Sequence, residues 1–403
     1  MARRKTLRAL TSRLAVLLVA ALLLTPSAPD VTAQTAAPER RPAPPAAPVA
    51  GDATLPERNA SPPPDGGGAS GDPPSTAPPP RRGGPPETRR RLKGVALDLN
   101  GTPDDARQFD LARQIGADVF RNTLSWDQLE PVQKGRFSTR YLGVIDAFVN
   151  QAEQRGIKPV FGLAGSPCWA SADPNKNCGA GQYKFWYPPT HPVDYGDALR
   201  VLTQRYGSRV LAWEVWNEPN LKEFWGGANP DPQKYVLMVK AARAASPDAF
   251  ILAGALSSSV SEYLVQLYDA GLLAEDYNAV SMHPYVWMDP APGGGPEDCD
   301  YMPMSFLCGV PNIHAIMQSR GDSRGEIWFT EFGWSSKLVG DSTQAGYLRR
   351  AFQIASTWSY VPVAMWFLAI DDALNDFRCC FGLFRADGTA KPAAQEFHAA
   401  ALP

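Results

Sequence analysis

The sequence has few of the residues that bind transition metals, and they do not occur at the spacings of known metal sites. Its 403 residues include only 4 histidines and 6 cysteines, and the positions of the cysteines match no zinc site. No Gly-rich phosphate loop follows the first apolar run after residue 92, which argues against a dinucleotide-binding sheet. The sequence therefore predicts neither a zinc protein nor a doubly wound nucleotide-binding enzyme.

The N-terminus has no apolar run long enough to cross a bilayer comfortably. The run Leu14–Leu24 follows a basic start and precedes the small residues Val31-Thr32-Ala33. This arrangement is typical of a signal peptide. We expect residues 1–33 to be a signal peptide and the protein to be secreted or associated with the cell envelope. An uncleaved N-terminal anchor is the alternative.

Residues 34–92 contain almost no large apolar side chains. Sixteen of the 39 prolines lie between Pro38 and Pro86, interleaved with Gly, Ala and Ser. Such a segment cannot bury enough apolar surface to offset the entropy of ordering. We interpret it as a disordered, semi-extended linker that holds a folded domain away from a surface. A disordered tail without that role is the alternative.

Charge is divided unevenly along the chain. From Gly94 onward there are 25 Lys and Arg against 34 Asp and Glu, whereas residues 34–93 contain 9 against 6. An acidic globular part argues against nucleic acid as a partner. The arginines of the linker could contact an anionic envelope, although a solvated charge run is the simpler interpretation.

All the cysteines lie in the globular part: Cys168, Cys178, Cys299, Cys308, Cys379 and Cys380. An even number in an exported chain favours disulfides. A bridge within the first pair and one within the second would each close a short loop, which stabilises by about 2–3 kcal/mol. The last two could bridge each other, remain thiols or pair differently.

After residue 92, apolar runs alternate with amphipathic stretches. The apolar runs are 93–99, 117–124, 157–164, 210–216, 249–256, 278–285, 326–332 and 363–370. Helical patterns between them include 103–116, 139–156, 231–246, 261–271 and 342–358, and several end in Gly. Eight apolar strands that alternate with helices predict an α/β fold, a (β/α)8 TIM barrel over 93–403. An open doubly wound sheet is the alternative.

Two of the predicted strands end in a glutamate. One runs into Asn217-Glu218 and the other contains Glu331 near its end. In such barrels the C-terminal ends of the strands build the active site. Isolated buried charges are costly, so acidic strand ends usually have a function, although each could instead cap a helix or pair with an arginine. By strand alternation we expect Glu214, Trp216 and Glu218 on one face.

Paired carboxylates across a cleft are the groups that hydrolyse glycosidic bonds. One, protonated, donates to the leaving oxygen, while the other attacks the anomeric carbon or directs a water. A separation of about 5–5.5 Å leads to retention of configuration and one of about 6.5–9.5 Å to inversion.

The stretch EVWNEPNLKEFW, residues 214–225, resembles the strand-4 motif of clan A glycoside hydrolases. The likeness is greatest to family 39, which includes β-xylosidases, α-L-iduronidases and bacterial exopolysaccharide endoglycosidases. Four further motifs occur in the expected order: RNTLSWDQLEP (121–131), SMHPYVW (281–287), WFTEFGW (328–334) and FGLFRADGTAKPAAQEF (381–397). The resemblance spans residues 94–403 and implies that Glu218 is the general acid/base and Glu331 the nucleophile of a retaining reaction.

Several polar residues near the two glutamates could support this chemistry. Asn217 could hold a sugar 2-hydroxyl. Tyr285 could donate to Glu331, and His283 could bind the sugar or the same carboxylate, with a core histidine as the alternative. Arg121 would keep Glu331 ionised at neutral pH, unless it forms a structural ion pair, for example with Glu214. The charge of Glu331 should then raise the pKa of Glu218.

Tryptophans gather at the predicted strand ends: Trp126, Trp169, Trp186, Trp225, Trp287 and Trp334, with Trp366 in the last strand. Sugar rings pack on such side chains, and we expect Trp126, Trp334 and Trp366 to bind substrate, with hydrophobic packing as the alternative for each. Asp371 and Asp372 could bind sugar hydroxyls or cap a turn. Two long loops, 166–190 and 286–310, would form walls braced by the predicted disulfides.

We therefore expect an exported retaining glycoside hydrolase that cleaves an extracellular or cell-envelope polysaccharide. The mechanism needs no metal or organic cofactor, and we expect a monomer. An exo-acting β-xylosidase-like enzyme on oligosaccharides is one alternative. A carbohydrate-binding pseudoenzyme is an alternative of a different class.

Overall fold

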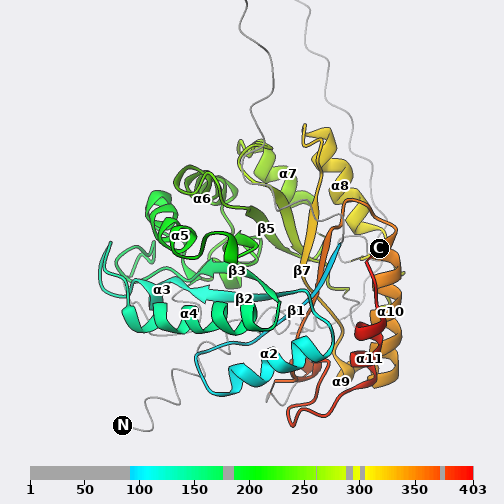
Figure 1. Cartoon of the computed structure of the whole chain (residues 1–403). Helices are drawn as coiled ribbons and strands as arrows, with labels where there is room; N and C mark the ends of the chain where they lie inside the picture. Colours follow the sequence, from blue (N-terminus) through cyan, green and yellow to red (C-terminus); the bar gives the residue numbers. More distant parts are fainter. Residues whose placement is uncertain are drawn as a thin grey trace, which may run out of the picture. The chain divides into compact units, whose positions relative to one another are not determined.

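The computed structural model describes residues 91–175, 186–259, 261–286, 294–299, 305–372 and 377–402. These residues form a closed barrel of eight parallel strands in chain order, surrounded by helices (Figure 1). The strands are β1 Leu92–Ala96, β2 Val119–Ser125, β3 Lys158–Ala164, β4 Ala212–Val215, β5 Ile251–Ser257, β6 Ala279–His283, β7 Ile327–Phe332 and β8 Val363–Trp366. The predicted (β/α)8 barrel is confirmed and the open sheet is excluded, because β1 pairs with both β2 and β8.

Helices follow the strands around the barrel. The longer ones are α2 Asp104–Gln114, α4 Thr139–Gln154, α5 Pro192–Tyr206, α6 Pro232–Ala245, α7 Ser261–Asp269, α8 Gly309–Ser319, α10 Asp341–Ser356 and α11 Pro392–Ala399. Figure 1 shows α4, α5 and α6 along one side of the barrel and α10 with α11 along another. The prediction did not single out α5 or α8, each of which has a proline in its first turn; proline is compatible with a helix there because those N–H groups have no helical partner.

The start of the barrel lies slightly earlier than predicted. The expected signal peptide, 1–33, and the expected linker as far as residue 90 lie outside the described residues. Leu92, assigned to the linker, opens β1. Arg91 donates to the carbonyls of Ser356 at 2.7 Å and Trp358 at 3.0 Å, at the end of α10. A cation at a helix C-terminus is favourable because of the helix dipole, so the chain is attached to the fold from Arg91 onward.

The barrel interior changes from apolar to polar along the strands. Its lower layer consists of apolar side chains, including Val119, Val160, Ala212, Leu252, Ala279, Trp328 and Met365. Two residues further along β2 and β4, on the same face, are Arg121 and Glu214. In β1, a side chain at Gly94 would come within 2.4 Å of Val119 and 2.7 Å of Met365, so glycine is required for this packing. The polar groups therefore lie toward the C-terminal ends of the strands.

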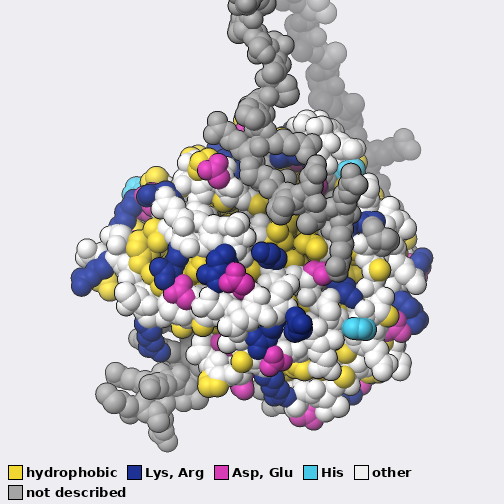
Figure 2. Space-filling model, viewed as in Figure 1, with side chains coloured by type: hydrophobic (Ala, Val, Ile, Leu, Met, Phe, Trp, Pro, Cys, Tyr) yellow, Lys and Arg dark blue, Asp and Glu magenta, His cyan; other side chains and the backbone are white. Residues whose placement is uncertain are grey.

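Charges of both signs are interspersed on the face shown in Figure 2. Some pair between neighbouring helices, as Arg205 of α5 does with Asp146 of α4 at 2.6 Å. Exposed pairs of this kind contribute about 0–1 kcal/mol, so the core rather than these pairs dominates stability. No helix in the described part of the chain is long and apolar enough to cross a membrane.

The disulfides are largely as predicted. Cys299 is bonded to Cys308, just before α8, as expected. Of the three alternatives for Cys379 and Cys380, the structure has the bridge between neighbours. Cys168 is also disulfide-bonded, and Cys178 lies outside the described residues.

Candidate active site

The backbone at the end of β4 departs from strand alternation. Trp216 has a φ of 68° and Glu218 a φ of 41°, in the left-handed region that residues with a side chain rarely adopt. Trp216 turns outward and packs against Tyr195 of α5 and Trp225, whereas Glu214 faces the barrel interior. The prediction that Trp216 shares a face with Glu214 is therefore wrong, because the positive φ interrupts the two-residue period. Such strain costs about 1–3 kcal/mol and is typical of active sites.

An irregularity in β7 aims Glu331 into the mouth of the barrel. Phe329 pairs with Ala364 of β8 and Phe332 with Trp366, so three steps on β7 face two on β8. Both phenylalanines pack in the core between the strands and the helices. Because of this bulge, Glu331 between them is directed inward.

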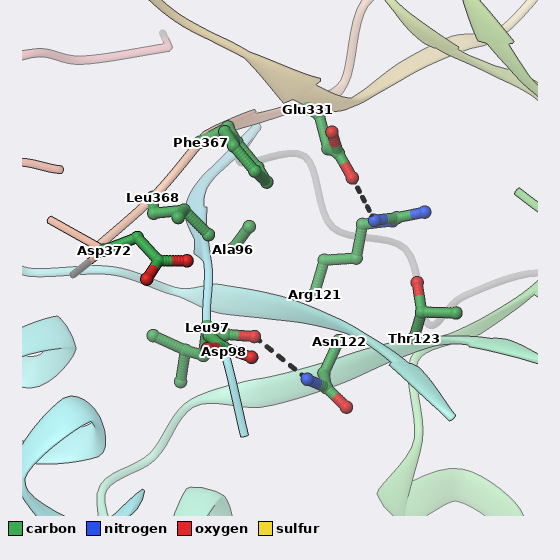
Figure 3. Close-up of a pocket in the computed structure, with 10 residues that line it drawn as sticks. All are labelled: Ala96, Leu97, Asp98, Arg121, Asn122, Thr123, Glu331, Phe367, Leu368 and Asp372. Atoms are coloured by element: carbon green, nitrogen blue, oxygen red, sulfur yellow. Dashed lines mark hydrogen bonds and ion pairs between the residues drawn. The ribbon is translucent and has the colours of Figure 1, made fainter. Parts of the chain in front are cut away.

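Arg121, on β2, connects three side chains at the mouth. Its Nε and one terminal nitrogen donate to Glu214 Oε2 at 2.8 and 2.6 Å, and the same terminal nitrogen donates to Asn217 Oδ1 at 2.7 Å. The other terminal nitrogen forms an ion pair with Glu331 Oε1 (Figure 3). Arg121 therefore pairs both with Glu331, as expected, and with Glu214, the alternative partner. Because arginine only donates, Asn217 must turn its oxygen toward Arg121, which leaves its NH2 group for another partner.

His283 and Tyr285 bring the two glutamates together. His283 Nδ1 lies 2.9 Å from Glu218 Oε1 and 3.6 Å from Glu331 Oε2. Tyr285 donates its hydroxyl to Glu331 Oε2 at 2.8 Å. The nearest oxygens of the two carboxylates can be no farther apart than the sum of their distances to the shared nitrogen. The two glutamates thus face each other at the same end of the barrel.

Burial dominates the protonation of this cluster. It raises the pKa of Glu331 to about 7, although Arg121 and Tyr285 act in the opposite direction. Burial and the charge of Glu331 raise the pKa of Glu218 well above its usual value, as the sequence predicted for Glu218. The expectation that Arg121 holds Glu331 fully ionised at neutral pH needs correction, because desolvation outweighs the guanidinium. Burial also lowers the pKa of His283, which is therefore neutral.

A hollow that Glu331 lines opens at the ends of β1, β2, β7 and β8 (Figure 3). Its lining is Ala96, Leu97, Asp98, Arg121, Asn122, Thr123, Glu331, Phe367, Leu368 and Asp372. Phe367, which was not among the predicted site residues, follows β8 directly and lines the hollow together with Glu331 (Figure 3). The sequence could have indicated Phe367 as a site residue, because it lies one residue beyond the end of a strand. Asp372 is at the hollow, whereas Asp371 accepts from Lys391 Nζ at 2.7 Å and from the Gly382 N–H, which is a turn-stabilising role.

The three tryptophans expected to bind substrate lie in the core instead of on an open surface. Trp126 is fully buried and donates to Glu130 Oε2 at 2.9 Å. Trp366 is fully buried and donates to the Phe381 carbonyl at 2.8 Å. Trp334 is 4% exposed, and its indole N–H bonds a backbone carbonyl at 3.0 Å. The structure therefore favours hydrophobic packing, the alternative to substrate binding, for all three tryptophans. Trp287 lies outside the described residues.

The described residues contain no group of three or more His, Cys, Asp or Glu side chains that could hold a metal ion. The site is a buried cluster at the C-terminal mouth of the barrel, made of Glu218, Glu331, Arg121, Asn217, His283 and Tyr285. This fold and site define a glycoside hydrolase of clan A. The family model for Cellulase (glycosyl hydrolase family 5) matches residues 86–303, and the chain belongs to this family.

Curated relatives match a short part of the chain. Beta-glucosidase 47 of Arabidopsis thaliana is 28% identical over 121 residues, which are 29% of this chain and 21% of that protein. Coniferin beta-glucosidase of Pinus contorta is 23% identical over 113 residues, 28% of this chain and 21% of that protein. The match therefore spans about a fifth of the length of these relatives.

Solved structures match most of the barrel. A family 39 glycoside hydrolase from Bacteroides cellulosilyticus WH2 superposes with a TM-score of 0.62 at 24% identity, covering 78% of this chain and 64% of that one. The GH39 enzyme from Xanthomonas axonopodis pv. citri has a TM-score of 0.58 at 19% identity, covering 79% and 67%. At such identities the likeness shows the fold. Together with the family model it confirms the expected clan A glycoside hydrolase and its likeness to family 39.

Proposed function

We propose that the protein is a retaining glycosidase in which Glu331 is the nucleophile and Glu218 the general acid/base. The observation that supports this most directly is the contact of both carboxylates with one atom, His283 Nδ1, at 2.9 and 3.6 Å. The resulting upper limit on the distance between their nearest oxygens is compatible with the carboxyl separation of about 5–5.5 Å in retaining enzymes, which is why we propose retention.

In the first step, ionised Glu331 attacks the anomeric carbon while the protonated Glu218 gives its proton to the leaving oxygen. The bond to the leaving group breaks as the bond to Glu331 forms, which produces a glycosyl ester. The raised pKa of Glu218 keeps its proton available at neutral pH. Arg121 and Tyr285 both donate to Glu331 and hold it in place.

In the second step, Glu218 takes a proton from water, and the resulting oxygen nucleophile attacks the anomeric carbon. Glu331 leaves as a carboxylate and Glu218 is protonated again. Since the ester carries no charge, the pKa of Glu218 falls in the intermediate and it can act as a base. The NH2 group of Asn217, turned away from Arg121, is suited to a sugar 2-hydroxyl, a contact that strengthens in the transition state.

The substrate we propose is an extracellular or cell-envelope polysaccharide, as the basic and apolar N-terminus and the Pro-rich segment suggest export and tethering. Exo action on β-linked oligosaccharides is the nearest alternative. The names of the two curated relatives place aryl β-glucosides in any first test panel, and the β-xylosidase-like alternative adds aryl β-xylosides. Reducing-end analysis separates the two modes, since an endo enzyme gives a ladder of oligosaccharides before any monosaccharide.

The test is hydrolysis of a panel of polysaccharides and aryl glycosides by the wild type, Glu331→Gln and Glu218→Ala. We expect Glu331→Gln to lose nearly all turnover and azide to restore activity to Glu218→Ala, with a glycosyl azide of unchanged anomeric configuration. Substantial activity of Glu331→Gln on a proven substrate would refute its role. Glycan binding without hydrolysis by the wild type would indicate a pseudoenzyme.

A further inference from the structure

Glu214 is a buried carboxylate that the proposed mechanism does not use. It lies on β4, four residues before the acid/base, and is fully buried in the barrel. Its Oε2 accepts two hydrogen bonds from Arg121, whereas Oε1 has no hydrogen-bond partner in the part of the chain that the structure describes. A buried charge is costly unless it is paired, and among the described residues Arg121 is the cation that pairs with Glu214.

The same guanidinium serves the nucleophile. Arg121 directs Nε and one terminal nitrogen to Glu214, and its other terminal nitrogen to Glu331. Two carboxylates thus share one cation in a site from which water is nearly excluded, as Arg121 is 2% exposed and Glu331 5%. In such surroundings the charge of one carboxylate acts strongly on the other.

We propose that Glu214 is a positioning residue that fixes Arg121 and takes up part of its positive charge, so that Glu331 is held by only a share of that charge. This inference rests on the proposed role of Glu331 as the nucleophile. A carboxylate fully neutralised by a guanidinium is a weaker base and a weaker nucleophile. Because Glu214 shares the guanidinium, ionised Glu331 keeps more of its negative charge, which favours positive charge at the anomeric carbon in the transition state.

The groups around this cluster determine what a titration would report. Those that face it are Arg121 from β2, Glu214 and Glu218 from β4 and beyond, His283 and Tyr285 from β6 and beyond, Tyr195 from α5, Tyr235 from α6, and Asp98 and Asp372 at the hollow. His283 is neutral, because burial lowers its pKa. The tyrosines are neutral as well, because burial raises theirs. Glu214 adds to the pKa of Glu331 and Arg121 lowers it, so the two act on the nucleophile in opposite directions.

The experiment compares the wild type with Glu214→Gln, which keeps the shape and an oxygen for Arg121 but removes the charge. The carboxyl carbons of glutamate are labelled with 13C, and the pKa of Glu331 is measured by NMR in the free enzyme. We expect this pKa to fall by about one unit in Glu214→Gln, a tenfold change in proton affinity. Glu214→Asp keeps the charge at a greater distance from Arg121, so it should change the pKa in the same direction by less.

Kinetics give a second measure. The acidic limb of the pH profile of kcat/KM reports Glu331 in the free enzyme. In Glu214→Gln it should move to lower pH by about one unit, and inactivation by a 2-fluoroglycoside should slow about tenfold. The control is Asp276→Asn, which removes a buried carboxylate paired with Lys240 at 2.7 Å, away from this cluster. It should leave both readouts unchanged.

An unchanged pKa of Glu331 and an unchanged acidic limb in folded Glu214→Gln would overturn the inference. So would loss of folded protein in both Glu214 variants while Asp276→Asn folds, since Glu214 would then be purely structural. The NMR measurement requires no turnover. If the wild type proves inactive on every substrate, the coupling of Glu214 and Glu331 through Arg121 is still measured, and only the proposed function fails.

Discussion

Tyr285 shows how one hydrogen bond acts on the chemistry of the site. It donates to Glu331 Oε2 at 2.8 Å and stabilises the ionised form of Glu331. Its own pKa is raised by burial and by the two neighbouring carboxylates, so it remains a donor throughout the working pH range. The hydroxyl of Tyr285, rather than its ring, therefore affects the protonation of Glu331.

We therefore predict that Tyr285→Phe raises the pKa of Glu331, because a bond to the charged form is lost. The acidic limb of kcat/KM should move to higher pH, opposite in sign to the shift expected for Glu214→Gln. The rate at the optimum should fall about tenfold to a hundredfold, as expected for a hydrogen bond to a charge worth about 1.5–3 kcal/mol. A profile that does not move would show that Tyr285 only packs against Phe367 and Phe381.

Single residues differ in how well the sequence identified them. Glu218 and Glu331 belong to ordered motifs at strand ends, so their place at the mouth could be predicted from periodicity and resemblance. Trp126, Trp334 and Trp366 also lie near strand ends, yet they are buried. Position along a strand predicts the height of a residue in the barrel, but not whether its ring faces the cleft or the helix layer.

At the scale of elements, β5 positions Glu218 through its backbone. The N–H of Glu218 donates to the Ala255 carbonyl at 3.0 Å. This carbonyl lies in an irregular part of β5, where the pairing with β6 shifts between Ala253 and Leu256. Gly254, within it, has a φ of 127°, and a side chain there would come within 2.3 Å of the Ser281 carbonyl. Only glycine fits this position.

Gly254→Ala should therefore lower the free energy of unfolding by about 3 kcal/mol, from backbone strain and overpacking. It should also reduce kcat, since the strand that holds the Glu218 backbone must move. Gly271→Ala is the matched control, because Gly271 also has a positive φ of 91° but no atom of the described residues lies within 4 Å of where its Cβ would be. We expect the control to lose about 1 kcal/mol in urea unfolding and to keep its kcat. Equal losses in both variants would contradict the role of the bulge.

The Cys299–Cys308 disulfide closes a short segment before α8, after the strand that carries His283. Replacing both cysteines with serine should lower the free energy of unfolding by about 2–3 kcal/mol through a larger entropy of the unfolded chain. Denaturation monitored with and without reductant checks this. Reductant should then destabilise the wild type more than the double variant; an equal effect on both would assign the sensitivity to Cys379–Cys380 or to Cys168.

At the scale of the whole molecule, the site makes stability depend on pH. The folded-state pKa values of Glu218 and Glu331 are raised above the ordinary value of a glutamate, so the folded protein holds these protons more tightly than the unfolded chain. Their contribution to stability is therefore fully present below the unfolded pKa of about 4.3 and is lost as pH rises through the folded values. The wild type should be less stable at pH 8 than at pH 5 for this reason.

We predict that Glu218→Gln removes most of this loss, because a neutral amide need not ionise in the barrel. The variant should gain stability relative to the wild type as pH rises from 5 to 8, by about 1.4 kcal/mol for each unit of pKa shift that is eliminated. Calorimetric melting temperatures at several pH values test it. A difference between variant and wild type that stays constant with pH would rule out the raised pKa of Glu218. Stabilisation with loss of activity is the trade-off expected at a strained site.

The sequence by itself determined the barrel, the order of its strands and the two glutamates at one end. These depend on local patterns, that is apolar runs of strand length, helical periods and the motifs around Asn217 and Glu331. Tertiary structure decided what depends on close contact between distant segments: the outward turn of Trp216, the sharing of Arg121 by Glu214 and Glu331, and the balance of burial against charge in the pKa of Glu331. Alternation gives each strand residue a face, but bulges, positive φ angles and desolvation arise only once neighbouring strands close the barrel.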